Sequence, residues 1–211
     1  MTERRGGSPV PATDAKVAGA DWSRKDISGE SHTRVAFVDL DMSEVENTGA
    51  VFTECTFRRT RFNASAHADA AFLNCTFAHC TFFDTRFTRC KFVGSTFDRC
   101  TYDIMQVVGG NWSLVALPGA DLKRATFRGV RMREADLRGA RCQGSSLRDV
   151  DLAGAMLDRA DFTECDLRGS DLSSLAPEMV TLRGAIISLE QAIVIASALG
   201  LDIRSDDESD G

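Results

Sequence analysis

The side chains in this sequence best suited to chemistry are seven cysteines and three histidines. Thiolates and imidazoles bind zinc, and paired thiols form disulfides. Six of the cysteines, however, are separated by five residues or a multiple of five, whereas zinc-ligand pairs stand closer together. The pattern favours small, buried thiols, which we expect to stay free in a reducing compartment: Cys55, Cys75, Cys80, Cys90, Cys100, Cys142 and Cys165.

The histidines do not form a catalytic pattern. A catalytic histidine needs a nucleophile or carboxylate within hydrogen-bond reach, and the sequence suggests none. His67 follows Asn47 by twenty residues, and we expect these two to form a polar pair or to distort the chain locally. His32 and His79 are interpreted as isolated, solvated residues. The sequence therefore predicts no catalytic, cofactor-binding or metal-binding residue and no enzyme.

The elements that carry these residues repeat with a period of five. Between Phe37 and Leu182, 26 of the 30 positions spaced by five are large and apolar. Twelve of the 13 phenylalanines fall in this register, and Phe83 is the exception. The position two residues earlier, from Val35 to Val180, is Ala, Cys, Ser, Thr, Val or Gly in all but three cases. The repeated unit is therefore small–polar–large–polar–polar.

A period of five excludes both an amphipathic helix and a simple alternating strand. Two apolar residues, two positions apart, point to the same side of a short extended segment, and the other residues can form a corner. One unit buries almost nothing, so successive coils must stack to make a core. The frame never slips between Phe37 and Leu182, which predicts no inserted loop. Residues 103–119 depart most from the repeat and are interpreted as a bulged or bent coil, not a ligand site.

The repeat resembles that of the pentapeptide-repeat family, whose consensus is A(D/N)LXX. Within that family the chain resembles most the MfpA-type, Qnr-like proteins, which bind DNA gyrase by imitating duplex DNA. The resemblance covers about residues 22–201 and is strongest in the segments that break or vary the repeat, which are 71–77 with His67 before them, 100–122, 189–192 and 199–201.

This resemblance implies an all-β solenoid, a right-handed quadrilateral β-helix with about 20 residues per coil and a short C-terminal α-helix. It also implies a homodimer joined through the C-terminal helix. The implied partner is DNA gyrase or a related type II topoisomerase, which the protein would modulate or protect from poisons such as fluoroquinolones or related natural products. The resemblance implies no cofactor and no reaction.

Coils of twenty residues divide the outward side chains among four faces. The most acidic face, called the acidic face below, has Phe62, Phe82 and Phe162 among its inward residues. It carries seven carboxylates and five basic residues, a net charge of −2, which is a weak stripe for an imitation of DNA. Its candidate partner-binding residues are Asp41, Glu44, Asp84, Asp103, Asp121, Asp161 and Glu164.

The period changes at the C-terminal end. Ser188 and Gln191 match a capping box, and Gly200 suits a helix stop, so we expect a helix over residues 188–201. The segment is apolar nearly all round, which predicts that the helix caps the last coil and also forms a two-fold dimer interface. The candidate interface residues are Leu189, Ala192, Ile193, Ile195, Ala196 and Leu199.

The expected organisation is a flexible tail at 1–19, a β-helix at 20–187 that is regular over 35–184, the helix at 188–201 and an acidic disordered tail at 202–211. A net charge of −6 disfavours direct nucleic-acid binding. No apolar run is long enough to span a membrane, and no apolar signal segment follows the first arginines, so the cytoplasm is expected. The alternative function is a non-catalytic scaffold for another protein, without topoisomerase activity.

Overall fold

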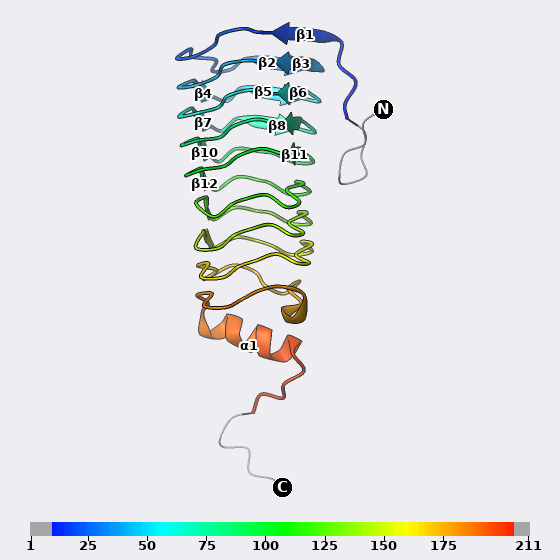
Figure 1. Cartoon of the computed structure of the whole chain (residues 1–211), viewed down its shortest axis with the longest axis vertical. Coiled ribbons are helices and arrows are strands. Elements are labelled where there is room, and N and C mark those ends of the chain that lie inside the picture. The colour runs from blue at the N-terminus through cyan, green and yellow to red at the C-terminus, as the bar shows by residue number, and fades with distance from the viewer. Residues whose placement is uncertain (1–9, 205–211) are drawn as a thin grey trace.

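The chain winds into a stack of about seven coils closed at one end by a short helix (Figure 1). This computed structural model describes residues 10–204. Every strand pairing is parallel and joins residues twenty positions apart, as in Phe52 with Phe72 and Phe57 with Phe77. Each coil therefore contains twenty residues, and the predicted β-solenoid is confirmed. No helix in residues 10–204 has the length and apolar character needed to cross a membrane.

The strands are short because each is one straight segment between two corners. They are β1 (Ala15–Ala18), β2 (Ser31–Thr33), β3 (Val35–Val38), β4 (Glu46–Thr48), β5 (Val51–Thr53), β6 (Thr56–Arg58), β7 (Ala66–Ala68), β8 (Ala71–Leu73), β9 (Thr76–Ala78), β10 (Arg86–Thr88), β11 (Thr96–Asp98), β12 (Gln106–Val108), β13 (Thr126–Arg128) and β14 (Ser146–Arg148). A 3₁₀ turn, η1 (Pro177–Met179), and the helix α1 (Leu189–Ala198) follow them.

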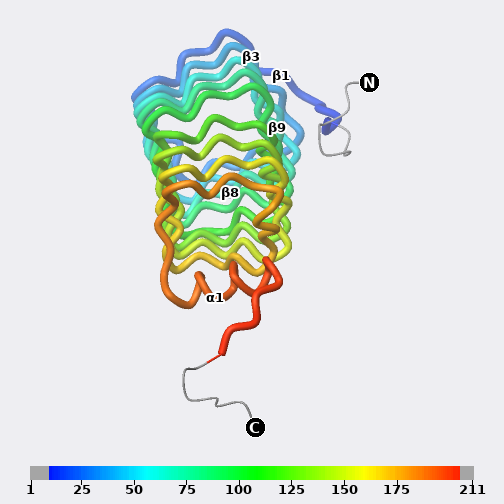
Figure 2. The backbone as a smooth tube through the Cα atoms, turned by 60° about the horizontal axis from the view of Figure 1, so that its bottom comes forward, coloured from blue at the N-terminus to red at the C-terminus, as the bar shows by residue number. Residues whose placement is uncertain are grey.

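Three of the four sides are parallel sheets, and the fourth is paired more sparsely. The sheets have the orders β1-β3-β6-β9-β11, β14-β13-β12-β10-β7-β4 and β2-β5-β8. The fourth side is the acidic face, where isolated bridges such as Asp41 with Arg61 and Arg141 with Asp161 join one coil to the next. Figure 2 shows the coils superposed as a four-sided tube.

The large position of the repeat fills the interior with columns of rings. Phe72 lies between Phe52 and Phe92, with ring centroids 4.9 and 4.7 Å away. These distances match the spacing of neighbouring strands, so the backbone ladder sets the rings at stacking distance. Trp112 continues the interior below Phe92, with centroids 4.2 Å apart and no exposed surface. Each coil thereby buries its apolar side chains against the coils above and below.

The corners place residues in the left-handed region of the backbone map. Many are not glycine, for example Arg59 at φ 52° and Glu134 at φ 54°. A left-handed residue with a side chain costs roughly 1–2 kcal/mol in isolation. The corner conformation persists because the bonds and packing on both sides of each corner determine it.

The solenoid begins earlier than the predicted boundary at residue 20. β1 pairs with β3, for example through Val17 and Phe37, so residues 15–18 are a strand and not part of a flexible tail. Ala15 and Val17 continue the small–large frame, which explains why this segment joins the ladder. Residues 1–9 and 205–211, which include most of the predicted tails, lie outside the described residues.

Candidate partner-binding surface

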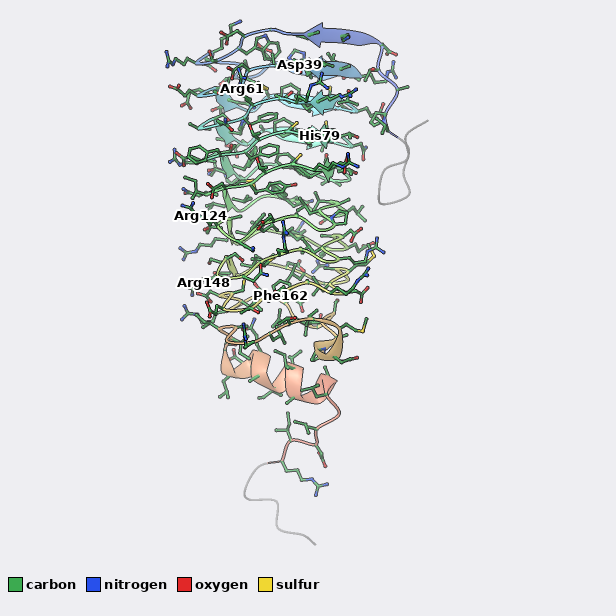
Figure 3. The ribbon with its side chains drawn as sticks, in the orientation of Figure 1. Asp39, Arg61, His79, Arg124, Arg148 and Phe162 are labelled. Carbon is green, nitrogen blue, oxygen red and sulfur yellow. The ribbon has the colours of Figure 1, made fainter. Side chains whose placement is uncertain are left out.

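The candidate carboxylates lie together on one side of the stack, and none of them is buried. The bridges that join Asp41 to Arg61 and Asp121 to Arg141 run along this side. Arg61 and Arg124 project from it as well (Figure 3). The twenty-residue coil therefore gathers side chains that are far apart in the sequence into one continuous surface.

Most of these carboxylates are engaged by arginines. Asp121 accepts a hydrogen bond from Arg141 at 2.9 Å, and Asp103 lies 3.1 Å from Arg124. Arg61 bonds Asp41 and, as the largest cause, lowers the pKa of that carboxyl to about 2. These arginines neutralise much of the negative charge along the face.

The remaining candidates differ in their surroundings. Glu44 pairs with Arg24 at 3.2 Å, and Asp84 pairs with Arg86 at 3.1 Å. Asp161 accepts from the Gln143 amide at 2.6 Å, and Glu164 makes no ion pair with a described residue. The least compensated part of the face is therefore its end near the C-terminal helix.

Asn47 and His67 form the predicted hydrogen-bonded pair inside the core. The Ser65 hydroxyl donates to the Phe62 carbonyl oxygen at 2.6 Å, so it accepts from Nε2–H of His67 at 2.9 Å. Nδ1 of His67 then accepts from the Asn47 amide at 2.9 Å, and Oδ1 of Asn47 accepts from the Ala50 N–H. The neutral imidazole has both nitrogens satisfied, which suits a structural role and leaves no reactive nitrogen.

Burial of His67 predicts a pH dependence of stability. Burial lowers the pKa of His67 to about 3, whereas an unfolded histidine has a pKa of about 6.5. The neutral form is therefore favoured by folding. The stabilisation is complete above the unfolded pKa and is lost, at about 1.4 kcal/mol per pH unit, as the pH falls towards 3. Urea denaturation of the wild type and of His67→Phe between pH 7 and pH 4 measures this contribution.

The variant isolates the histidine because both proteins share every titrating carboxylate. His67→Phe leaves the Asn47 amide without its acceptor, which is a cost that does not vary with pH. The difference in unfolding free energy between the two proteins should shift in favour of the variant as the pH falls. A difference that stays constant over this range would contradict the assignment.

The seven cysteines are free thiols in the structure. Cys75, for example, donates to the Phe52 carbonyl oxygen at 3.4 Å. Burial raises the pKa of Cys90 to about 11 and that of Cys165 to about 11, which keeps both in the unreactive thiol form. Within residues 10–204, no group of three or more His, Cys, Asp or Glu side chains is placed to hold a metal ion.

One histidine and one glutamine have roles that the sequence did not fully indicate. His32, expected to be isolated, stacks on Phe52 with ring centroids 5.1 Å apart, because it occupies a large position of the repeat. His79 is exposed, as expected. Gln191 completes the predicted capping box with Ser188, and its amide also donates to the carbonyl oxygens of Leu167 and Ser170, both at 2.7 Å. These bonds fix α1 to the last coil.

The helix α1 covers the end of the stack (Figure 1), but several of its apolar side chains stay exposed. The exposed fractions of Leu189, Ile193 and Leu199 are 80%, 47% and 56%. Ala192 and Ala196 are half-buried. Ile195, another predicted interface residue, is half-buried and packs partly against the solenoid core, because it lies four residues after Gln191 on the same side of the helix.

Comparison with known proteins supports the family that the repeat suggests. The family model described as pentapeptide repeats matches residues 115–141 and 135–173, in eight copies. No curated protein sequence matches the chain significantly.

Several solved structures are similar in fold. Trypsin-treated QnrB1, described as a plasmid-mediated fluoroquinolone resistance protein, is 20% identical with a TM-score of 0.59, covering 92% of this chain and 100% of that one. Full-length QnrB1 is 20% identical with a TM-score of 0.53, covering 90% and 99%. HetL of the cyanobacterium Nostoc, involved in heterocyst differentiation regulation, is 17% identical with a TM-score of 0.44, covering 83% and 86%.

At this identity, the likeness to QnrB1 demonstrates a shared fold. The matched repeats lie in the part of the chain that forms the C-terminal half of the stack, and the same twenty-residue pairing continues up to β1. The repeat, the coil and the matched repeats agree, and the chain folds as a pentapeptide-repeat β-helix.

Proposed function

We propose that this protein is a non-catalytic binding protein whose partner is DNA gyrase or a related type II topoisomerase. The rod would occupy the surface of the enzyme that receives DNA, and would modulate the enzyme or protect it from poisons such as fluoroquinolones. The observation that carries the proposal is the row of seven unburied carboxylates along one side of a stack of coils. The fold shared with QnrB1, described as a fluoroquinolone resistance protein, supports it.

The net charge supports the same partner class. A protein of charge −6 is repelled by nucleic-acid phosphates and attracted to a basic surface that binds them. We therefore propose that the protein competes with DNA and does not bind it. The cytoplasm, where a bacterial topoisomerase meets its DNA, is the compartment that this function requires.

The acidic face can be tested by charge reversal. The double variant Asp103→Lys and Asp121→Lys is expected to raise the concentration needed for half-inhibition of gyrase supercoiling by about tenfold, because lost charge complementarity slows association and weakens binding. The control is the double variant Asp39→Lys and Asp69→Lys, which breaks two similar inter-coil pairs, with Arg59 and Arg89, off the acidic face. The control should inhibit like the wild type.

The two possible failures have different meanings. Equal inhibition by both double variants would exclude the acidic face as the binding surface. If the wild type neither inhibits gyrase nor relieves poison-induced DNA cleavage, the topoisomerase proposal itself fails.

We further propose that two copies associate through α1. The exposed apolar side chains of Leu189, Ile193 and Leu199 gather at one end of the rod, and a two-fold contact would cover them. Ile193→Glu is expected to convert a dimer to a monomer of 23.0 kDa, because a buried unpaired carboxylate costs at least about 2 kcal/mol. Light scattering after size-exclusion chromatography measures the mass.

A matched substitution separates an interface effect from a general one. Val108 is 48% exposed on the side of the stack, close to the exposure of Ile193. Val108→Glu should leave the dimer intact. If the wild-type protein is monomeric at every concentration tested, the dimer proposal is wrong.

A second candidate function is a scaffold for another protein. It is favoured by the arginines that pair with Asp41, Asp103 and Asp121, because they weaken the one-sided potential that imitation of DNA needs. Capture of a specific non-topoisomerase partner, together with an inactive gyrase assay, would establish this alternative.

A further inference from the structure

The backbone ladder of the acidic face is interrupted between two coils. Bridges join Thr81 to Thr101 above this point and Asp121 to Arg141 below it, but none joins Thr101 to Asp121 in the described part of the chain. The flanking bonds are regular, with Phe82 N–H to the Thr101 oxygen at 2.9 Å and Leu122 N–H to the Arg141 oxygen at 2.7 Å. The bonds to the outer neighbours are thus intact, and the two coils separate only between Thr101 and Asp121.

The opening leaves backbone donors free. The N–H groups of Arg99, Tyr102, Ile104 and Asp121 have no acceptor among residues 10–204, although the equivalent groups of the neighbouring coils on this side bond the next or previous coil. The carbonyl oxygens that would accept these bonds, those of Cys100, Pro118, Asp121 and Lys123, also have no backbone donor in residues 10–204. A ligand in the opening would therefore meet both backbone donors and backbone acceptors, and the charged side chains decide which kind of ligand is favoured. Tyr102, which replaces phenylalanine in its column, and Pro118 both lie at this opening.

A cavity of about 560 Å³ occupies the opening. This volume is within the range of small-ligand pockets. The aromatic rings of Phe97 and Tyr102 and the ring of Pro118 form part of its lining. Tyr102 is 3% exposed, so the aromatic part of the lining is the interior of the solenoid itself. Phe97 is equally covered, so only the edges of these two rings border the cavity, and the half-buried Pro118 supplies more of its accessible apolar surface.

The charged lining is predominantly basic. Arg99, Lys123, Arg124 and Arg141 face the cavity with two carboxylates, those of Asp103 and Asp121. Both carboxylates are already paired, Asp103 with Arg124 at 3.1 Å and Asp121 with Arg141 at 2.9 Å. Lys123 has no ion pair with a described residue, and Arg99 is 4.0 Å from Asp98. Two cations thus remain available to a ligand.

The Tyr102 hydroxyl adds a further donor. It lies beside the Cys100 thiol, and it makes no hydrogen bond to a nitrogen or oxygen of residues 10–204. Burial raises the pKa of Tyr102 well above its usual value, which keeps the phenol protonated. Because Tyr102 lines the cavity, a ligand there could offer this hydroxyl an oxygen or nitrogen acceptor.

We propose that this cavity binds a small organic anion. The carboxylate or phosphate of the ligand would lie against Arg99, Lys123 and the free N–H groups, since charge-assisted hydrogen bonds are the strong ones. Its apolar body would contact Phe97, Tyr102 and Pro118. The site does not depend on the topoisomerase proposal, because its binding is measured on the protein alone.

The test uses benzoate and phenyl phosphate as probes, with benzamide as the neutral analogue and inorganic phosphate as the anion without an apolar body. Calorimetry is expected to show binding of at least one organic anion with a dissociation constant of about 1 mM or lower. Benzamide and inorganic phosphate should bind at least about tenfold more weakly. In NMR spectra, the shifted backbone amides should be those of Arg99, Tyr102, Ile104 and Asp121.

Matched variants locate the site. The double variant Arg99→Gln and Lys123→Gln should raise the dissociation constant of the organic anion by about tenfold or more. The control, Arg58→Gln with Lys91→Gln, removes two exposed cations that lie away from the cavity, and should bind like the wild type. Circular dichroism checks that both variants fold.

Three outcomes would overturn the proposal. They are no binding of either organic anion up to about 10 mM, equal binding by the two double variants, and amide shifts that lie elsewhere on the rod. Inorganic phosphate that binds as tightly as phenyl phosphate would overturn the role of the apolar lining.

Discussion

Phe72→Ala is expected to lower the free energy of unfolding by about 3–5 kcal/mol. The Phe72 ring has no exposed surface and stacks between Phe52 and Phe92 at 4.9 and 4.7 Å. Its loss removes both stacking contacts and leaves a cavity that the ladder cannot close, because the backbone bonds fix the coil spacing. Urea denaturation followed by circular dichroism measures the change.

Phe83 provides the control for this substitution. It is the phenylalanine outside the inward register, and it is 49% exposed on the acidic face. Phe83→Ala should change stability by less than about 0.5 kcal/mol. If the two variants lose similar stability, the ring columns are not the main source of the stability of the core.

Gly110→Ala is expected to cost about 3 kcal/mol or more. Gly110 has φ +91°, and a Cβ there would lie 2.1 Å from the Cys90 carbonyl oxygen and 2.8 Å from the Cys90 nitrogen. These are backbone atoms of the coil above, so relief requires the coils to move apart. Strain and overpacking each contribute roughly 1–3 kcal/mol. The midpoint of urea denaturation should fall accordingly.

Gly129→Ala separates the crowding from the backbone conformation. Gly129 has φ +63°, and a Cβ there would meet nothing within 4 Å. The substitution should therefore lower the free energy of unfolding by about 1 kcal/mol, through the left-handed backbone conformation alone. Equal losses at Gly110 and Gly129 would mean that the coils separate easily at Cys90.

The fold could be predicted from the sequence because the five-residue period determines which side chains point inward. Two inward positions per five residues, held in frame from Phe37 to Leu182, leave a stacked coil as the arrangement that buries both. The Asn47–His67 bond and the capping box at Ser188 were also predictable, since each follows from residue type at a fixed separation. The start at β1 was missed because glycine, proline and charge in the first residues suggested a tail, although Ala15 and Val17 were in frame.

Other features depend on details that residue types do not carry. Left-handed corners at residues such as Arg59 have no glycine signal, because the ladder imposes them. The charge pairs could have been predicted from the sequence, since Asp41 and Arg61 are twenty residues apart, as are Asp121 and Arg141. The cavity could not have been predicted, because it arises where backbone groups of residues 99–104 and 118–123 do not form their hydrogen bonds. The sequence marked residues 103–119 as irregular without indicating an open space.

The twenty-residue coil also constrains how such a chain can change length. Duplication of the gene segment for twenty residues would add one coil to the rod and leave every later side chain on its original side. Duplication of a single five-residue unit would keep the core frame but turn all later residues by one side, so that Asp121 and Arg141 would move off the acidic face. Growth that preserves a binding surface must therefore come in steps of four repeats.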